Sequence, residues 1–345
     1  MRTALKGLDT SGVEVHDHKE LLVVEAGSAE EAKRETEVEA LLVEQGVMTR
    51  WEAFKLGSVY TELPLWCLRA RAHVVERAAE LLPRVMSMME ELEIGGGNQA
   101  QLRNDLESKA FVDIGRKDAH GRAVIWMRGR YINPRRSSST DIARLFATVL
   151  LHALRDTSVQ QHGFVWLADT YDVSMTNVTP ATINAFWRVV MPNMPIRLGV
   201  VFMVNPPWIV SQIMFPIIST FLSAKVRKKH VMIYGARKEL WAAQLVDFDV
   251  PITSIPIELG GTAHVDVDAY IASVCMYGNI ATTCDRRTRS SSTASISRAP
   301  TLEVILPEST TTLVNLPKSF TWWDTNLNHP PYVWLWQNHP YDSTW

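Results

Sequence analysis

The sequence is poor in cysteine. Cys67, Cys275 and Cys284 are the three cysteines among 345 residues. They form no CxxC pair and have no histidine at the spacing of a zinc-ligand pair, so neither a disulfide framework nor a zinc site is indicated. This cysteine usage fits a reducing compartment. We therefore expect no structural metal and no cofactor.

The chain also lacks a charge excess. Thirty-five Lys and Arg residues face 37 Asp and Glu residues, which gives a formal net charge of -2. Nucleic-acid binding depends on clustered excess Lys and Arg, so nucleic acid is not expected as a partner. At 46% hydrophobic residues the chain can bury a full core, and its length suggests two or three structural units.

Long uninterrupted apolar runs are scarce. The first twenty residues lack the apolar run of a secretory signal, so a cytoplasmic protein is expected. Residues 198–224 carry no charge and are long enough to cross a bilayer, but Asn205, Pro206, Pro207 and Pro216 interrupt them. One continuous membrane-spanning helix is therefore not predicted.

Composition divides the chain into five segments. They are a loose polar tail (1–35), a helical unit (36–94), an α/β domain (105–284), a Ser/Arg-rich linker (285–300) and an aromatic, β-rich C-terminal segment (301–345). The glycine triplet at residues 95–97 is interpreted as a hinge, because no GK[ST] follows that would make it a phosphate loop.

Strand-like and helix-like patterns alternate within the α/β domain. Expected strands are Ala123–Met127, Gly163–Ala168, Leu198–Val204 and Val231–Tyr234. Expected helices are Thr140–Leu154, Pro180–Val190, Pro207–Ser223 and Ala236–Val246. This order predicts an α/β fold with a mostly parallel sheet covered by helices.

Three stretches resemble motifs of the CRAL-TRIO lipid-binding family, in the family's order. LPLWCLRARAHVVERAAELL (63–82) is similar to LLRFLRARKFDVEKA, and KDAHGRAVIWMRGR (117–130) is similar to a D-x-x-G-R-P-V-I strand, with Ala123 in place of proline. Residues 195–262, from PIRL through VVFMVNPPW to IPIELGGT, resemble the Y-P-E-R, I-N-x-P and L-P-x-E-x-G-G motifs. The resemblance covers about two thirds of the chain.

The resemblance implies a small N-terminal helical unit followed by an α/β domain with an apolar lipid pocket. It places a gate helix at residues 207–223, and a cover that is apolar on every face suits a removable lid better than an ordinary surface helix does. The candidate gate and pocket residues are Trp208, Ile209, Ile213, Phe215, Ile217, Ile218 and Phe221. Expected partners are a phospholipid or another hydrophobic small molecule, with transient peripheral contact to membrane surfaces.

The resemblance also implies a headgroup site for the phosphatidylinositol-binding members. Its arginine corresponds to Arg71, its acidic-basic pair to Ile196 and Arg197, and its lysine to His230. Two of the four groups are kept, and Lys228 or Lys229 could replace the lysine. The headgroup candidates are Arg71, Arg197, His230, Lys228 and Lys229. The identity of the lipid stays open.

Three alternatives remain beside the lipid carrier. Residues 207–223 could form an ordinary core helix, and the fold could serve as a membrane-associated scaffold without cargo. Catalysis is not expected, because His152, His162 and His230 are scattered and the GxSxG, HExxH and P-loop motifs are missing. Asp169 and Asp172 mimic paired carboxylates, but they follow a strand, where Asp usually caps a turn.

Overall fold

The structure is a computed structural model. It describes residues 24–56, 60–94, 99–174, 176–177, 179–220 and 222–277. Several sequence predictions lie outside these residues: most of the tail, the glycine hinge, Phe221, the linker and the C-terminal segment.

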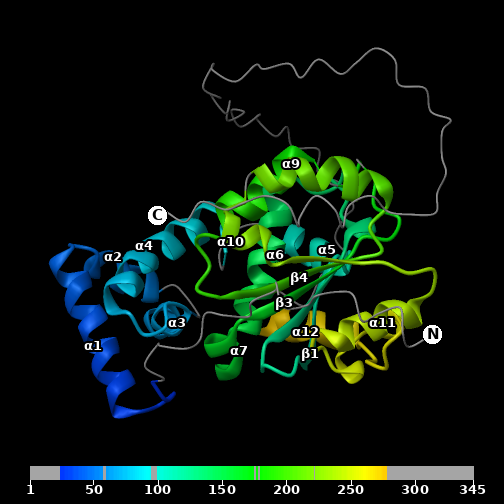
Figure 1. The fold of residues 1–345 in the computed structure, drawn as a ribbon. Helices are drawn as coiled ribbons and strands as arrows, with labels where there is room; N and C mark the ends of the chain where they lie inside the picture. Colours follow the sequence, from blue (N-terminus) through cyan, green and yellow to red (C-terminus); the bar gives the residue numbers. More distant parts are fainter. Residues whose placement is uncertain are drawn as a thin grey trace, which may run out of the picture. The chain divides into compact units, whose positions relative to one another are not determined.

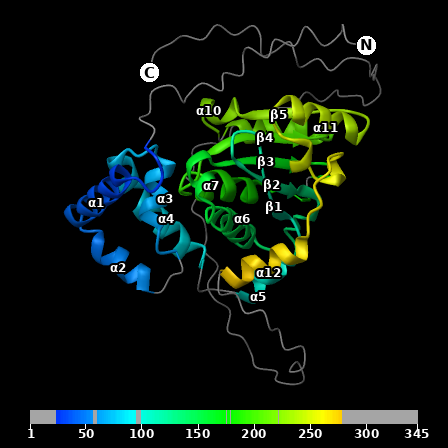
Figure 2. The same cartoon turned by 90° about the horizontal axis from the view of Figure 1, so that it is seen from below.

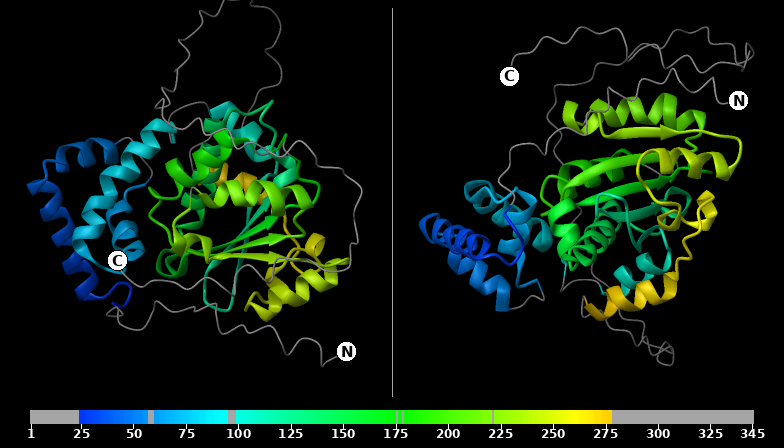
Figure 3. Two further views of the ribbon diagram at one scale, coloured as in Figure 1. Left: turned by 45° about the horizontal axis from the view of Figure 1, so that its top comes forward. Right: turned by 60° about the horizontal axis from the view of Figure 1, so that its bottom comes forward.

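Four helices form the N-terminal group (Figure 3). They are α1 (Ala29–Glu44), α2 (Met48–Leu56), α3 (Leu63–Ala70) and α4 (Val75–Glu91). The predicted helical unit is confirmed, but it begins earlier than the expected residue 36. Ser28 caps α1, because its hydroxyl accepts a hydrogen bond of 3.1 Å from the Glu31 N–H. Residues 29–35 therefore belong to a helix and not to a loose tail.

The α/β domain contains one five-stranded sheet in the order β1-β2-β3-β4-β5 (Figure 2). The strands are β1 (Phe111–Lys117), β2 (Ala123–Arg128), β3 (Phe164–Asp169), β4 (Leu198–Val204) and β5 (His230–Ile233). Strands β2 to β5 are parallel and were predicted, whereas the antiparallel strand β1 was not. The α/β fold with a mostly parallel sheet is confirmed.

Helices and short helical turns connect the strands. They are α5 (Gln99–Glu107), η2 (Gly129–Tyr131), α6 (Ser139–Ala153), α7 (Thr157–His162), α8 (Pro180–Asn184), η3 (Ala185–Val190), η4 (Val210–Met214), α9 (Phe215–Thr220), α10 (Ala224–Arg227), α11 (Lys238–Asp247), η5 (Ile252–Ser254), η6 (Ile257–Leu259) and α12 (Val267–Tyr277). A capping box between Ser138 and Asp141 starts α6 close to the predicted residue.

The two faces of the sheet pack against different helices. On one face, Ile125 and Trp166 join a core with α6, η3, η4 and α12. On the other face, Val124 and Phe202 pack against α11 and the turns that follow it. Figure 1 shows α9 and α11 on opposite sides of the strands. Strand β3 is buried along its whole length, as expected for a central parallel strand.

The predicted helix at residues 207–223 forms from residue 208 to residue 220, with a π-helical turn in its middle. The Phe215 N–H donates to the carbonyl of Val210, five residues earlier, which makes η4 a π-helical turn. Pro216 has no N–H for the next bond, and Ser223 caps α10 as a separate helix. Within the described residues, no helix is both long and apolar enough to cross a membrane.

Candidate functional site

A row of six aromatic rings fills the interior between the sheet and residues 207–220. We call it the aromatic row; it comprises Phe111, Phe146, Trp166, Trp187, His230 and Phe215. Successive ring centroids lie 4.7 to 5.6 Å apart. The rings come from β1, α6, β3, η3, β5 and α9. The row is therefore built where six elements meet.

The segment covering this row is apolar on both of its sides. Val210 and Met214 are buried against the core. Trp208 is 60% exposed, Ile217 48% and Ile213 38%. A helix covering a globular core normally directs polar residues to water, so this outer face differs from an ordinary cover. The segment carries no charged side chain, and its outer side presents these three apolar side chains beside the exposed Thr220.

The other predicted gate residues point inward or sideways. Ile209 and Ile218 are half-buried and pack against the core. Phe215 is also half-buried, with its ring 5.3 Å from the His230 ring. Phe215 therefore belongs to the inner side of the segment.

Three of the predicted headgroup cations gather at one edge of the sheet. Arg197 precedes β4 and Lys229 precedes β5, so both lie at the amino ends of neighbouring parallel strands. The Lys229 ammonium donates to the Leu198 carbonyl, beside Arg197. Arg71, at the end of α3, lies close enough to Arg197 to lower its pKa further, beyond the effect of burial. We call Arg71, Arg197 and Lys229 the cationic edge.

The positive charges at the cationic edge repel one another. Burial lowers the pKa of Arg71, and the neighbouring Arg84 and Arg77 act in the same direction. Among the described residues no carboxylate forms an ion pair with Arg71 or Arg197. Arg197 instead donates to the carbonyls of Arg69 and Ala70, with a distance of 3.1 Å from Nε to the Ala70 oxygen. Partly buried like charges without a counterion favour an anionic ligand.

His230 and Lys228 do not join this edge in the expected way. The His230 ring lies between Trp187 and Phe215, at centroid distances of 5.4 and 5.3 Å. Its Nδ1 donates to the Val226 carbonyl at 2.9 Å, and burial lowers its pKa. His230 is therefore an aromatic packing residue in this structure. Lys228 is exposed on the turn before β5.

Sequence reasoning missed a buried ion-pair network that anchors the N-terminal helices. Arg69 makes a bidentate pair with Glu31, at 2.7 and 2.6 Å, and also donates to Gln160 of α7. His73 lies 2.9 Å from the same carboxylate. Burial alone would raise the pKa of Glu31, but these partners and the Gly27 N–H hold it at about 2. Arg69 of the LRAR stretch thus has a structural role, whereas Arg71 is available to bind a ligand.

The acidic pair after β3 behaves as a turn. The Asp169 carboxylate accepts from the Tyr171 N–H at 3.1 Å, and Asp172 is exposed with a left-handed backbone (φ 58°). This agrees with the capping role expected from the sequence. The described residues contain no cluster of three or more metal-ligating side chains.

Comparison with known proteins identifies the domain. Residues 106–261, from the end of α5 to the glycine pair after η6, match the family model of the CRAL/TRIO domain. This stretch of the chain is a CRAL/TRIO domain. Proteins of this family are generally lipid-binding or lipid-transfer proteins.

Clavesin-1 is a curated relative of this protein. The Xenopus laevis protein is 28% identical over 149 residues, which are 42% of this chain and 43% of Clavesin-1. The Rattus norvegicus protein is 27% identical over 149 residues, or 42% of this chain and 40% of that protein. The chain therefore matches less than half the length of these relatives. The crystal structure of Sfh5 aligns at 15% identity and a TM-score of 0.35, covering 51% of this chain and 66% of that chain.

Proposed function

We propose that this protein binds one hydrophobic ligand, a phospholipid, in the interior occupied by the aromatic row. In this proposal residues 207–220 act as the gate that closes the interior and opens against a membrane. A phospholipid with about thirty acyl methylenes would lose about 24 kcal/mol if those groups entered water, at roughly 0.8 kcal/mol each. A carrier must therefore enclose the chains almost completely, which requires an apolar interior and an apolar cover.

One observation carries this proposal: the gate exposes Trp208, Ile213 and Ile217 to solvent while its other side closes the core. Exposed apolar side chains on a cover are costly in water and favourable at a bilayer interface. The segment also lacks any charged residue from position 198 to 224, so inserting it into an interface would bury no ionised group.

The cationic edge is the proposed site for the lipid phosphate. Arg71 and Arg197 are half-buried guanidiniums, which are suited to bidentate pairing with phosphate oxygens. An inositol headgroup receives less support. Ile196, which replaces the acidic group, is buried in the core at 4% exposure, and His230 is held in the aromatic row. Restoring Glu and Lys at these two positions would place charges in packed apolar surroundings, so stability is expected to fall.

Lipid extraction tests the proposal directly. The purified protein should release about one phospholipid per chain on organic extraction, measured by mass spectrometry, and should take up lipid from vesicles. Ile217→Asp should stay folded and transfer lipid about tenfold more slowly or worse, because a carboxylate resists entry into the interface. Ile257→Asp is the matched control, since Ile257 is also 48% exposed but lies on η6.

A cargo-free scaffold is the second candidate, and one observation favours it. The aromatic row is closely packed, with Phe146 fully buried and its ring 4.7 Å from that of Trp166. A lipid can enter only if some of these rings move. Extraction that yields no lipid above background, together with no uptake from vesicles, would establish this scaffold and overturn the carrier.

A further inference from the structure

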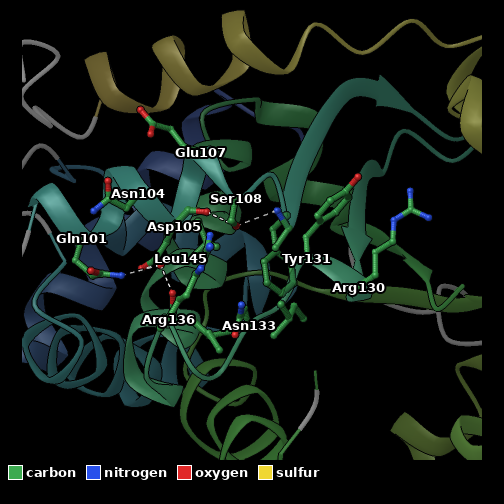
Figure 4. A pocket seen from close by; sticks show the side chains of 15 residues that line it. Gln101, Asn104, Asp105, Glu107, Ser108, Arg130, Tyr131, Asn133, Arg136 and Leu145 are labelled. Carbon is green, nitrogen blue, oxygen red and sulfur yellow. Dashed lines mark hydrogen bonds between the residues drawn. The ribbon is translucent and has the colours of Figure 1, made fainter. Parts of the chain in front are cut away.

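A polar cavity lies apart from the gate and the cationic edge. It has a volume of about 580 Å³ and is enclosed by α5, η2 and the loop that leads into α6 (Figure 4). Its size falls in the range of small-molecule sites. The proposed lipid function makes no use of it.

Asp105 of α5 is the central polar group of this cavity. One carboxylate oxygen, Oδ1, accepts from the Ser137 hydroxyl and from the Gln101 amide, the latter at 3.0 Å. The other oxygen, Oδ2, is buried and has no hydrogen-bond partner among the described residues, and Asp105 as a whole is only 3% exposed. A buried acceptor without a partner is costly, so its persistence beside a cavity points to a donor supplied by a ligand.

The remaining polar lining is neutral overall and rich in hydrogen-bonding groups. Asn104 contributes an amide donor and acceptor, and Asn133 contributes an amide whose oxygen also accepts from the Arg135 N–H. Two acidic residues, Asp105 and Glu107, are balanced by two arginines, Arg130 and Arg136. This balance contrasts with the cationic edge and favours an uncharged ligand.

Burial raises the pKa of Asp105, although the hydrogen bonds from Ser137 and Gln101 oppose the shift. A hydroxyl group is a suitable partner in either protonation state, because it donates to a carboxylate and accepts from a carboxylic acid. An ammonium group matches only the ionised state.

Apolar side chains also line the cavity. They include Phe111, Ile142 and Leu145, which are almost completely buried, and the Phe111 ring is also the first member of the aromatic row. A sugar ring has this combination of surfaces, with hydroxyls around its rim and C–H groups on its faces.

We propose that this cavity binds a neutral sugar ring, either free or as the headgroup of a glycolipid. The hydroxyls pair with Asp105 and the amides, and the C–H face lies on Phe111 and Leu145. The glycolipid form rests on the proposed lipid function, since its chains would follow Phe111 into the aromatic row; the free form does not depend on it.

Two experiments distinguish a free sugar from the headgroup of a glycolipid. Calorimetric or ligand-observed NMR titration with methyl β-D-glucopyranoside tests the free ring, for which an affinity on the order of a millimolar is expected from its small size. Flotation and transfer with phosphatidylcholine vesicles, with or without glucosylceramide, test the headgroup. Saturable sugar binding, or a preference for the glucosylceramide vesicles, supports the proposal for the corresponding source.

Two variants locate the binding. Asp105→Ala should weaken it about tenfold or more, since it removes a charge-assisted hydrogen bond. Asn104 is exposed, and Asn104→Ala, which should leave folding unchanged, is expected to weaken binding about threefold to tenfold. Asn184→Ala, an exposed asparagine on α8, is the matched control and should have no effect.

Either of two results would overturn the sugar-site proposal. If neither probe binds, or if both Asp105→Ala and Asn104→Ala bind as tightly as the original protein, the cavity is not a sugar site. Should Asp105→Ala lose its fold, the Asn104→Ala result decides alone. Phospholipid extraction and Ile217→Asp transfer assess the lipid proposal separately, so the two can fail independently.

Discussion

The two faces of the CRAL-TRIO sheet are both covered by helical segments, but the covers differ in kind. Helix α11 buries Trp241 and Leu245, and its outer side carries the charged Lys238 and Glu239 beside the exposed Leu240 and Val246, whereas the gate carries no charge. The gate buries Val210 and Met214 and directs Trp208, Ile213 and Ile217 outward. A cover with charges on its outer side is held to its sheet, because leaving it would expose apolar surface to water or bury charge in lipid. A cover without charge lacks this restriction at a membrane.

The largest expected effect lies on the α11 face. Leu245 is fully buried there, so Leu245→Asp should lower the free energy of unfolding by more than about 3 kcal/mol, through lost packing and an unpaired buried carboxylate. Urea unfolding measures this loss, and Leu245→Met should cost less than about 1.5 kcal/mol. If Leu245→Asp and Ile217→Asp lowered the free energy of unfolding equally, the gate would be an ordinary cover like α11.

The gate side of the sheet also contains a titratable acid. Asp113 of β1 pairs in register with Ile125, and burial raises its pKa to about 6, against the opposing Gly115 N–H. Asp156 raises this pKa further and Lys117 lowers it, while Tyr270 of α12 lies against the carboxyl group.

The contribution of Asp113 to stability should therefore fall as the pH rises, opposite in sign to that of His152, whose pKa burial lowers to about 4. The folded-state pKa of Asp113 lies above its ordinary 3.8, so the protonated form is the stabilised one. The contribution is complete below about pH 4 and lost as the pH rises through 6, with an upper bound of about 3 kcal/mol. Melting temperatures between pH 4.5 and 7.5 measure it. Asp113→Asn should flatten this dependence; an unchanged slope would show that other groups cause it.

Ligand removal should weaken the gate face alone. A lipid present at a hundredfold excess over its Kd stabilises the folded state by about 2.7 kcal/mol. After delipidation, amide hydrogen exchange should increase in Val210–Thr220 and stay unchanged in Lys238–Asp247. A uniform increase across both segments would indicate that the ligand does not bind under the gate.

Much of the fold could be predicted because its strongest patterns are local. The parallel strands β2 to β4 are short apolar runs that are buried on both faces, and the sequence marks them clearly. Strand β1 was missed because Asp113, Gly115 and Arg116 interrupt its apolar pattern. The start of α1 could have been found, since Ser28 and Glu31 have the spacing of a capping box.

The candidate site was harder to predict, because its contacts join distant parts of the chain. Nothing local distinguishes Arg69, which pairs with Glu31, from Arg71, which lies near Arg197. The inward side of Phe215 depends on the π-helical turn before it, which shifts the side chains relative to a regular helix. The Asp105 cavity depends on a loop that meets α5 from more than thirty residues away.

The smallest expected effect concerns the charges beside each cover. Lys228 lies on the turn between α10 and β5, Lys238 begins α11, and both are exposed. A basic group near an anionic leaflet contributes about 1 kcal/mol, so Lys228→Gln should weaken binding to phosphatidylserine-containing vesicles about fivefold. Lys238→Gln should leave binding unchanged, because in the proposed orientation the α11 face points away from the membrane.

Vesicle flotation at two salt concentrations measures both variants. Raising the ionic strength shortens the range of the attraction, so the difference between Lys228→Gln and the original protein should shrink with salt. The loss for an apolar variant such as Ile217→Asp should persist, because it does not depend on attraction between charges. If Lys238→Gln weakened binding as much as Lys228→Gln, association would reflect overall charge rather than a docked gate, and the membrane role of the gate would lose its support.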